Sequence, residues 1–384
     1  MKKGLPLEPV EWAAGADLKL APSVAISDAG HLVNKPAVVE WENYFKNVLT
    51  NLNANQAFSC LHNWQPITAT NSSNDQSAGY VRTDTGWILN ADNGTDDTVF
   101  LLSEVDLSVE ASVALTPGSG AFTPAVVAFG NGVSLVGGDN SIDDDAIWSS
   151  LTDVDNWTER TLTGITGSVF AIVYEPVNDE FLALTTSQEV YSSADGATWG
   201  AETAFSNVQY PNSYVVAAAG GYVAKAGWTG SDPYQNIVEW TDDGGATWNV
   251  TNVGSTYAGH TEDVIALSYS EQYEKWILVN EKLGVYTADT PGGTWTEETA
   301  AWSTVVSGAA RIFGSTIVAR FARTYGRYLV YSTDLGATWK SVGFDPSTAI
   351  VDVWATGNSI VVTNASGAWK SGSIANVDDI AGLI

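Results

Sequence analysis

The sequence predicts an all-β protein whose main part is a seven-bladed β-propeller. Within one stretch, residues 168–204, three apolar or alternating runs are followed by a polar run. Four short strands per repeat, with the innermost the most apolar, are typical of a propeller blade. Repeats of 40 to 50 residues indicate solenoids, propellers or arrays. Five tryptophans mark this period, because they lie 42 to 49 residues apart: Trp157, Trp199, Trp248, Trp295 and Trp339.

Composition supports the same fold class. The chain has 384 residues, of which 36 are glycine and 16 are tryptophan, and only 16% are charged. This balance favours a turn-rich β protein over a helical one. The length fits two average domains, but β repeats of this kind also form longer single units.

The blades can be placed in order along the chain. Strands two to four of a first blade are expected within residues 86–114, and three strands of a last blade within residues 350–371. Residues 63–69 resemble a fourth strand, so we expect them to complete the last blade and close the ring without a long open edge. Pro66 is acceptable there because a fourth strand is an edge strand. Complete four-strand frames fit residues 123–162, 168–204, 213–253, 263–299 and 307–343.

Three regions are therefore expected: an arm with one helix at 1–62, the propeller at 63–374 and a tail at 375–384. Pro36 suits the first turn of a helix. The apolar residues after it follow the 3, 4, 3, 4 spacing of a coiled-coil seam. This helix either packs on its own domain or lies at the axis of a homotrimer. Its seam residues are Val38, Trp41, Phe45, Val48 and Leu52.

A short peptide, which we call the box, occurs at 192–199, 241–248, 287–295 and 332–339. It is expected to join the third and fourth strands of a blade. Its Asp carboxylate accepts backbone N–H groups, its Gly adopts a positive φ, and its Trp packs onto the blade. These roles are structural, with no chemistry. The residues concerned are Asp195, Gly196, Trp199, Asp243, Gly245, Trp248, Asp289, Gly293, Trp295, Asp334, Gly336 and Trp339.

The boxes resemble the Asp-box (bacterial neuraminidase) repeats of sialidase-like β-propellers. Two copies depart from the pattern, since the Asp of 192–199 is one place late and 287–295 has one extra residue. Proteins with such repeats include sialidases, other glycosidases, lectin-like propellers, assembly factors and viral tail proteins. The resemblance therefore implies a fold and leaves the function open.

Catalysis is not expected. The resemblance to sialidases implies three arginines that bind a carboxylate, a Tyr nucleophile assisted by Glu, and an Asp acid/base. The family's Arg-Ile-Pro motif is absent, and four of the six arginines lie close together in one blade: Arg311, Arg320, Arg323 and Arg327. A glycosidase that uses two carboxylates remains an alternative, because the chain has 44 acidic residues.

Several partners and cofactors are disfavoured. The net charge of −28 argues against nucleic acid and anionic membranes. No apolar run can span a bilayer, and no secretion signal is recognised. The single Cys60 excludes a disulfide within the chain, and His31, His62 and His260 are too dispersed for a zinc site. Asp143–Asp145 lacks the spacing of a calcium loop. We expect no metal and no cofactor.

A ligand is expected at the end of the propeller opposite the boxes. The loops there carry aromatic residues, whose rings can stack on the apolar faces of sugars. Packing of these rings over the blades is the alternative for any one of them. The candidate residues are Tyr210, Trp228, Tyr234, Tyr257, His260, Trp302, Tyr325 and Arg327, and Asn236 can supply a further hydrogen bond.

The first 50 residues resemble the attachment segments of bacteriophage tail fibre and tail-tip proteins. The resemblance rests on Pro9-Val-Glu-Trp-Ala13 and on Pro36 followed by Glu40-Trp-Glu-Asn43. It implies a virion tail appendage that is assembled in the host cytoplasm, forms a trimer, binds other tail proteins and recognises a host surface glycan or receptor. The alternatives are a glycan-hydrolysing tail enzyme and a purely structural tail adaptor.

Overall fold

A computed structural model was obtained for the chain. It describes residues 65–66, 76–92, 97–103, 107–116, 122–140, 146–152, 156–205, 208–209, 215–229, 234–257, 264–299, 310–314, 316–323, 326–342, 350–356, 359–364 and 367–370. The chain divides into two units, one of Met1–Asn63 with Ser373–Ile384 and one of Trp64–Gly372. The description below concerns the second unit. The predicted arm, the helix seam and the tail lie outside the described residues.

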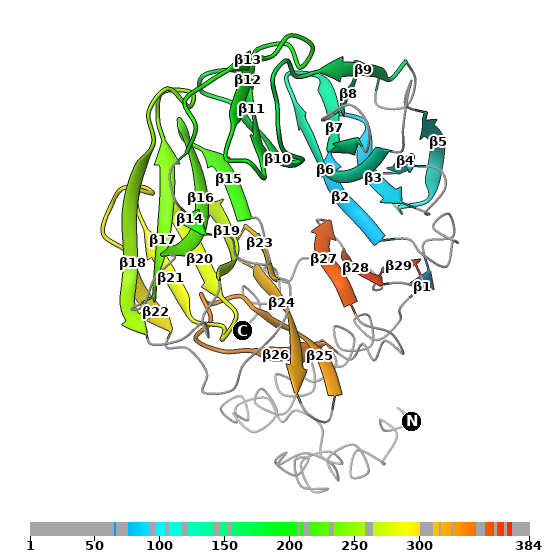
Figure 1. The fold of residues 1–384 in the computed structure, drawn as a ribbon. Coiled ribbons are helices and arrows are strands. Elements are labelled where there is room, and N and C mark those ends of the chain that lie inside the picture. Colours follow the sequence, from blue (N-terminus) through cyan, green and yellow to red (C-terminus); the bar gives the residue numbers. More distant parts are fainter. Residues whose placement is uncertain are drawn as a thin grey trace, which may run out of the picture. The chain divides into compact units, whose positions relative to one another are not determined.

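Six sheets consist of strands that follow one another in the chain (Figure 1). The first three are β2 (Gln76–Arg82), β3 (Gly86–Asp92), β4 (Asp97–Ser103) and β5 (Val109–Leu115); β6 (Phe122–Gly130), β7 (Val133–Asn140), β8 (Ala146–Ser150) and β9 (Thr158–Thr161); and β10 (Val169–Glu175), β11 (Glu180–Thr185), β12 (Val190–Ser193) and β13 (Gly200–Ala201).

The other three continue the same antiparallel pattern. They are β14 (Val208–Gln209), β15 (Val215–Ala219), β16 (Tyr222–Thr229), β17 (Tyr234–Thr241) and β18 (Asn249–Tyr257); β19 (Val264–Ser270), β20 (Lys275–Asn280), β21 (Val285–Ala288) and β22 (Thr296–Thr299); and β23 (Ala310–Phe313), β24 (Thr316–Arg323), β25 (Gly326–Ser332) and β26 (Lys340–Val342).

A seventh sheet is composite. It joins β27 (Ile350–Thr356), β28 (Ser359–Asn364) and β29 (Gly367–Lys370) to β1 (Gln65–Pro66), which comes from the other end of the unit. β1 pairs with β29 through Gln65 opposite Lys370 and Pro66 opposite Trp369. Gln65 and Pro66, which lie within the predicted strand 63–69, thus pair with the third strand of the last sheet.

The fold is an all-β propeller, as the sequence predicts. The first strands of neighbouring sheets contact one another in chain order, and β27 also contacts β2. Figure 1 shows these strands facing a common centre. The predicted number of seven blades is wrong, because the structure has six blades, each built entirely of consecutive strands. The strands β27, β28 and β29 do not make another such blade, since no fourth strand follows them among the described residues.

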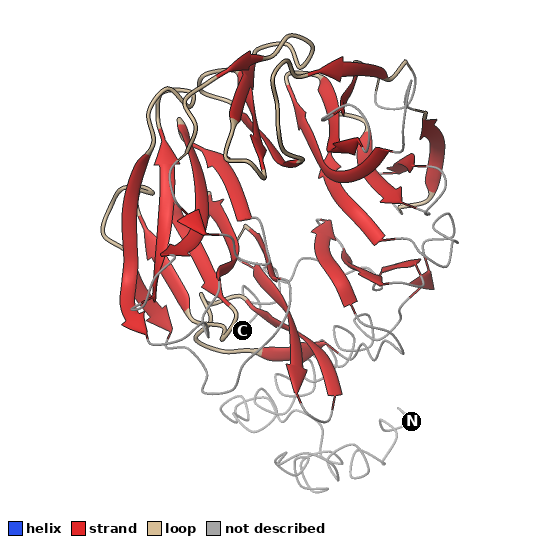
Figure 2. Ribbon diagram, viewed as in Figure 1, coloured by secondary structure: helices blue, strands red, loops and turns tan. Residues whose placement is uncertain are grey.

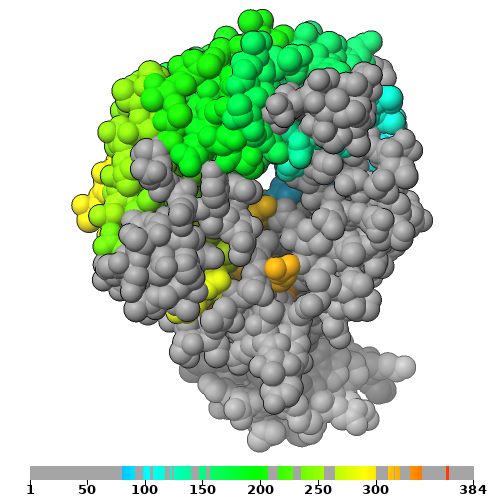
Figure 3. Space-filling view, viewed as in Figure 1, coloured from blue at the N-terminus to red at the C-terminus, as the bar shows by residue number. Residues whose placement is uncertain are grey.

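The innermost strands are the most apolar because both of their faces are covered. In the innermost strand β10, Val169 has no exposed surface, and in the next strand β11 the same holds for Phe181 and Leu182, whereas the outer strand β13 is exposed throughout. Neighbouring sheets share apolar clusters, and each cluster draws residues from two sheets. In the space-filling view, the sheets from β6 to β18 form one continuous surface (Figure 3).

Two strands were not expected from the sequence. β2 has the largely polar sequence Gln76-Ser-Ala-Gly-Tyr-Val-Arg82 but pairs with β3 as the first strand of its sheet. β14 adds a fifth strand to the sheet of β15–β18 by pairing with the end of β16, where Gln209 lies opposite Trp228. In the described part of the chain, all regular structure is strand and none is helix (Figure 2).

The box tryptophans lie between blades. Each of the five repeat tryptophans packs in the cluster that joins its own sheet to the preceding one. Trp248, for example, contacts the cluster of Phe170, Leu182 and Phe205, with its ring centroid 6.0 Å from that of Phe205. The box turn therefore holds neighbouring blades together as well as joining two strands.

The contact between a box turn and the preceding blade can be tested at a glycine. A Cβ added at Gly336 (φ +83°) would lie 2.6 Å from Val285 Cγ2 of the preceding blade, whereas one added at Gly132 (φ +72°) would meet nothing within 4 Å. Gly132→Ala is expected to cost about 1–2 kcal/mol through backbone strain alone. Gly336→Ala should cost about 1–3 kcal/mol more, through overpacking. Urea unfolding of both variants measures the difference, and equal costs would rule out the packing role.

Candidate functional site

We call the end of the sheets that carries the box turns the box end. In an antiparallel sheet of four strands, the turns after the first and third strands lie at one end, and the turn after the second strand lies at the other. The connection to the next sheet also leaves from that other end. Each end must therefore be examined for the groups that it offers to a ligand.

The box turn at 241–248 is closed by its own polar groups. The Thr241 hydroxyl donates to Asp243 Oδ1 at 2.8 Å and accepts the Gly245 N–H at 3.0 Å. Thr247 donates its N–H to Asp243 Oδ1 at 2.8 Å and its hydroxyl to Oδ2 at 2.6 Å. Asp243 thus accepts hydrogen bonds across its own turn, as in an Asx-turn.

The turn at 332–339 has the same geometry. Asp334 accepts from the Thr338 N–H at 2.8 Å and from its hydroxyl at 2.6 Å, and Gly336 N–H donates to Ser332 Oγ at 2.9 Å. In the turn at 192–199, where the Asp is one place late, Asp195 Oδ1 accepts from the N–H groups of Ala197 and Thr198 at 2.8 and 2.7 Å.

These bonds favour the ionised carboxylates. The pKa of Asp195 is lowered chiefly by the Thr198 N–H bond. For Asp243 and Asp334, desolvation acts to raise the pKa, but bonds from the hydroxyl and N–H of Thr247 and of Thr338 outweigh it, and the pKa falls. Carboxylates whose acceptor positions are occupied in this way are poor candidates for acid/base chemistry at neutral pH.

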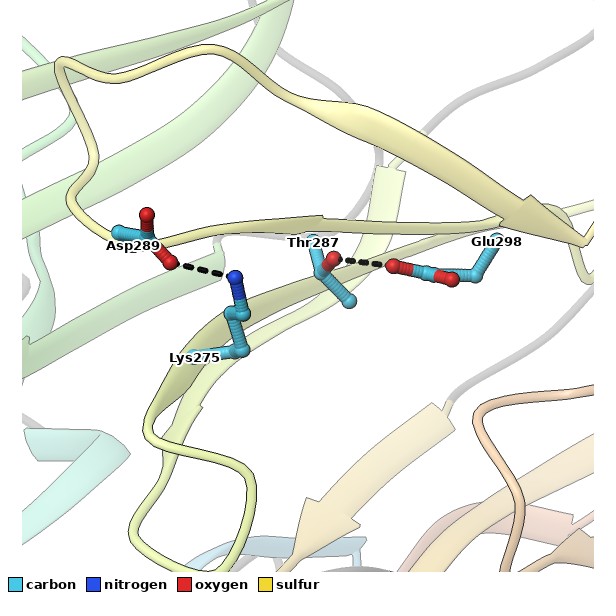
Figure 4. Close-up of polar contacts among 4 residues, drawn as sticks. All are labelled: Lys275, Thr287, Asp289 and Glu298. Atoms are coloured by element: carbon cyan, nitrogen blue, oxygen red, sulfur yellow. Dashed lines mark hydrogen bonds and ion pairs between the residues drawn. The ribbon is translucent and has the colours of Figure 1, made fainter.

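The fourth copy, at 287–295, departs from the pattern (Figure 4). Asp289 forms an ion pair with Lys275 of the adjacent strand β20. The Thr287 hydroxyl donates to Glu298 Oε1 at 2.6 Å, and Trp295 Nε1 donates to the Pro291 carbonyl at 3.1 Å. The carboxylate of Asp289 thus pairs with a neighbouring strand, in a turn that is one residue longer than the other copies.

At the opposite end, the sheet of β14–β18 is the most extended. Its strands β16, β17 and β18 have eight, eight and nine residues, whereas the corresponding strands β20, β21 and β22 of the next sheet have six, four and four. Tyr234 lies directly opposite Tyr257 in the register. Trp228 lies opposite Asn236 on the neighbouring strand pair. The backbone thus brings the positions of Trp228, Tyr234 and Tyr257 together at this end of one sheet.

Arg327 lies near the start of β25, opposite Ala322, and so also at the end away from the boxes, but on a different sheet. Asn236 is only 2% exposed, so it is not a surface group that can bond a ligand from solvent. The other candidate residues lie outside the described residues: Tyr210, His260, Trp302 and Tyr325.

A buried charged pair within this extended sheet was not predicted from the sequence. Lys225 and Glu239 are opposite one another in the register of β16 and β17 and are 1% and 0% exposed. Lys225 Nζ lies 3.9 Å from the centroid of the Phe205 ring, which belongs to the connection from the preceding blade. Burial lowers the pKa of Lys225 to about 8, against the opposing effect of the Glu239 charge. In the sequence, Lys225 and Glu239 are charged residues within apolar strands. Such residues are equally consistent with side chains that face solvent.

Neither a metal site nor a membrane span is found where the structure can be described. No group of three or more His, Cys, Asp or Glu residues is placed to hold a metal ion among those residues. They also include no helix that is long and apolar enough to cross a membrane.

Comparisons with solved structures show the fold alone. YCF48 from Cyanidioschyzon merolae is 12% identical with a TM-score of 0.56, covering 82% of this chain and all of that one. Virginiamycin B lyase from Staphylococcus aureus is 10% identical with a TM-score of 0.55, covering 80% of this chain and 97% of that one. Both likenesses support a β-propeller. No family model and no curated protein sequence matches the chain.

Proposed function

We propose that this protein is a non-catalytic binding propeller that recognises a glycan on a host surface as part of a bacteriophage tail appendage. The observation that carries the binding proposal is the register at the extended end of the β14–β18 sheet, which groups the positions of Trp228, Tyr234 and Tyr257. Aromatic side chains are the residue type that stacks on sugar rings. At the box end, the carboxylates of Asp243 and Asp334 are engaged within their own turns, which favours the opposite end for a ligand.

The virion context rests on the resemblance of the N-terminal segment, and the Asp-box assignment rests on the four boxes. We further propose that the composite sheet closes the ring between the sixth blade and the first. This proposal is supported by contacts of β27 with β23 and with β2, and by the packing of Val361 with Leu89 and Leu102 of the first blade.

Binding is tested by a glycan array followed by product analysis on the glycans that bind. Trp228→Ala or Tyr234→Ala is expected to weaken binding roughly tenfold, about 1–2 kcal/mol, because each removes one stacking surface. No shortened glycan should appear. Asp242→Ala is the control, because Asp242 is exposed on the same sheet at the box end.

The outcomes separate three functions. Products released from a bound glycan would favour the hydrolase. Absence of binding to any glycan or host surface would favour the structural adaptor. Equal loss of affinity in Asp242→Ala would place the ligand elsewhere. The thermal midpoint of each variant shows whether lost binding reflects unfolding.

A further inference from the structure

We propose that strand β18 (Asn249–Tyr257) is an interaction edge, which pairs with the same strand of a second copy of this chain. The proposal concerns the outer rim of one sheet and does not depend on the glycan binding proposed above. Three features of the described residues carry it: the position of β18 at an open sheet edge, the length of the strand, and the absence of charge along it.

β18 is the outermost strand of its sheet. It pairs with β17 on one side and has no strand on its other side among the described residues, as Figure 1 shows. The side chains or backbone of Asn249, Val250, Asn252 and Gly254 are exposed to solvent. In an antiparallel sheet, every second residue of an edge strand directs its N–H and C=O away from its one neighbour. β18 therefore offers a row of backbone hydrogen-bonding groups with which a further strand can pair.

The other outer strands are protected against such pairing. Natural proteins block open edges with charged side chains, with proline or by keeping the strand very short. β1 contains Pro66, and β13 has only two residues. β18 is the longest outer strand described, with nine residues, and none of them is charged. The remaining four outer strands each carry charge: Glu110 in β5, Glu159 and Arg160 in β9, Glu297 and Glu298 in β22, and Lys340 in β26.

The edge is held in place by its own sheet. Trp240 on β17 lies opposite Asn249 and donates a hydrogen bond from Nε1 to Thr251 Oγ1 at 3.0 Å. The pairing with β17 is regular as far as Asn252, and the register shift comes only after that residue. Val253, which follows, is buried in the cluster shared with the next sheet. Residues 249–252 thus form a regular, anchored segment of edge that needs no rearrangement before pairing.

A second copy of the chain is the partner that this edge fits. A twofold axis places β18 antiparallel to its own copy, so one neutral strand supplies both sides of the contact. Each chain has a net charge of −28, and two copies therefore repel one another most where acidic side chains meet. β18 brings only uncharged residues to the contact, and cross-strand pairs of Thr and of β-branched side chains are favourable. The outer strands β5 and β22 would instead bring glutamates of both copies together.

The test compares two double variants of the full chain by sedimentation equilibrium. The edge variant is Val250→Lys with Asn252→Lys, because lysine is the side chain that most often blocks edge pairing. The matched control is Ser112→Lys with Ala114→Lys, two exposed residues with the same spacing on the outer strand β5. Both variants make the net charge less negative by the same amount, so long-range repulsion between copies is matched.

The unchanged chain is expected to form a dimer at micromolar concentration, and the edge variant to associate at least roughly tenfold more weakly. The control should associate as the unchanged chain does. A monomeric unchanged chain overturns the proposal. Equal association of all three proteins overturns it as well, because the contact then lies elsewhere, for example at the predicted N-terminal seam. Circular dichroism melting shows whether each variant is folded.

Amide hydrogen exchange of the unchanged chain provides a second measurement that needs no variant. Peptides covering residues 249–252 should exchange more slowly at high protein concentration than at low, because the outward N–H groups become hydrogen-bonded only in the pair. Peptides from β5 should show no such dependence, and an exchange rate at 249–252 that is independent of concentration contradicts the proposal. Glycan binding is measured separately on the same proteins. The edge variant leaves Trp228 and Tyr234 unchanged, so a failure of the proposed function remains distinct from a failure of this proposal.

Discussion

Glu239→Leu is expected to destabilise the propeller by about 3–5 kcal/mol, because it leaves the buried Lys225 without its counter-charge. Both side chains are almost fully buried and are register partners on β16 and β17. Equilibrium unfolding in guanidinium chloride measures the loss. Lys225→Met should cost a similar amount for the converse reason, since the Glu239 carboxylate then stays buried beside an apolar group.

The double variant Lys225→Met with Glu239→Leu is the decisive control. An apolar pair of similar volume avoids the desolvation of both charges, so the double variant should recover most of the loss and can equal the unchanged protein. A double variant that loses the sum of the two single effects would show that the two charges act independently, against this account.

The pH dependence follows from the same site. Burial lowers the pKa of Lys225 to about 8 from an ordinary value of 10.5. Between these two values the unfolded chain binds a proton that the folded protein has lost, so this lysine makes stability rise with pH. Its destabilising effect is fully present below pH 8 and disappears as the pH approaches 10.5. Subtracting the profile of the double variant isolates this contribution, and a flat difference would contradict it.

Trp248→Ala is expected to cost about 3–5 kcal/mol, the range for removing a large aromatic side chain from a core. Trp248 packs between two blades, against Phe205 and Leu182, so its removal opens a gap in an interface. Trp248→Phe should recover part of the loss. Val250→Ala, two residues later and 52% exposed, should change the unfolding free energy by less than about 0.5 kcal/mol.

A comparable loss in Trp248→Ala and Val250→Ala, measured by urea unfolding, would show that the box tryptophan does not hold the blades together. A large loss in the first alone would support the interblade role. The same comparison can be made at Trp339, which packs against the cluster of the preceding sheet.

Much of the fold could be predicted from local patterns. The periodic Trp residues and apolar runs located most strands, because a strand buried on both faces is written as a continuous apolar stretch. The polar strand β2 was missed, since its position depends on pairing with β3 and its own sequence shows no apolar pattern. β14 was missed because a strand of two residues is too short to show an alternation of apolar and polar side chains. The altered turn at 287–295 could not be resolved, because the choice of Lys275 as the partner of Asp289 depends on a neighbouring strand.

The candidate site was predictable only in part. The sequence placed Trp228, Tyr234 and Tyr257 in loops opposite the boxes, and the register brings their positions together at the end of one extended sheet. It also offered Asn236 as a surface group, whereas the fold buries it. Burial of a polar residue depends on the sheet that packs over it, and this information is not local.

The sequence by itself determined the repeat, most strands of the blades, three of the four box turns and the strand that joins both ends of the propeller. These features depend on short-range hydrogen bonds and on the alternation of apolar residues, and both involve residues that are close together in the sequence. Only the tertiary structure decided which charges are buried and which blade each box tryptophan contacts. It also decided that Gln65 pairs with Lys370. Those properties arise from packing between segments far apart in the chain, where the energy of a residue depends on its neighbours in space.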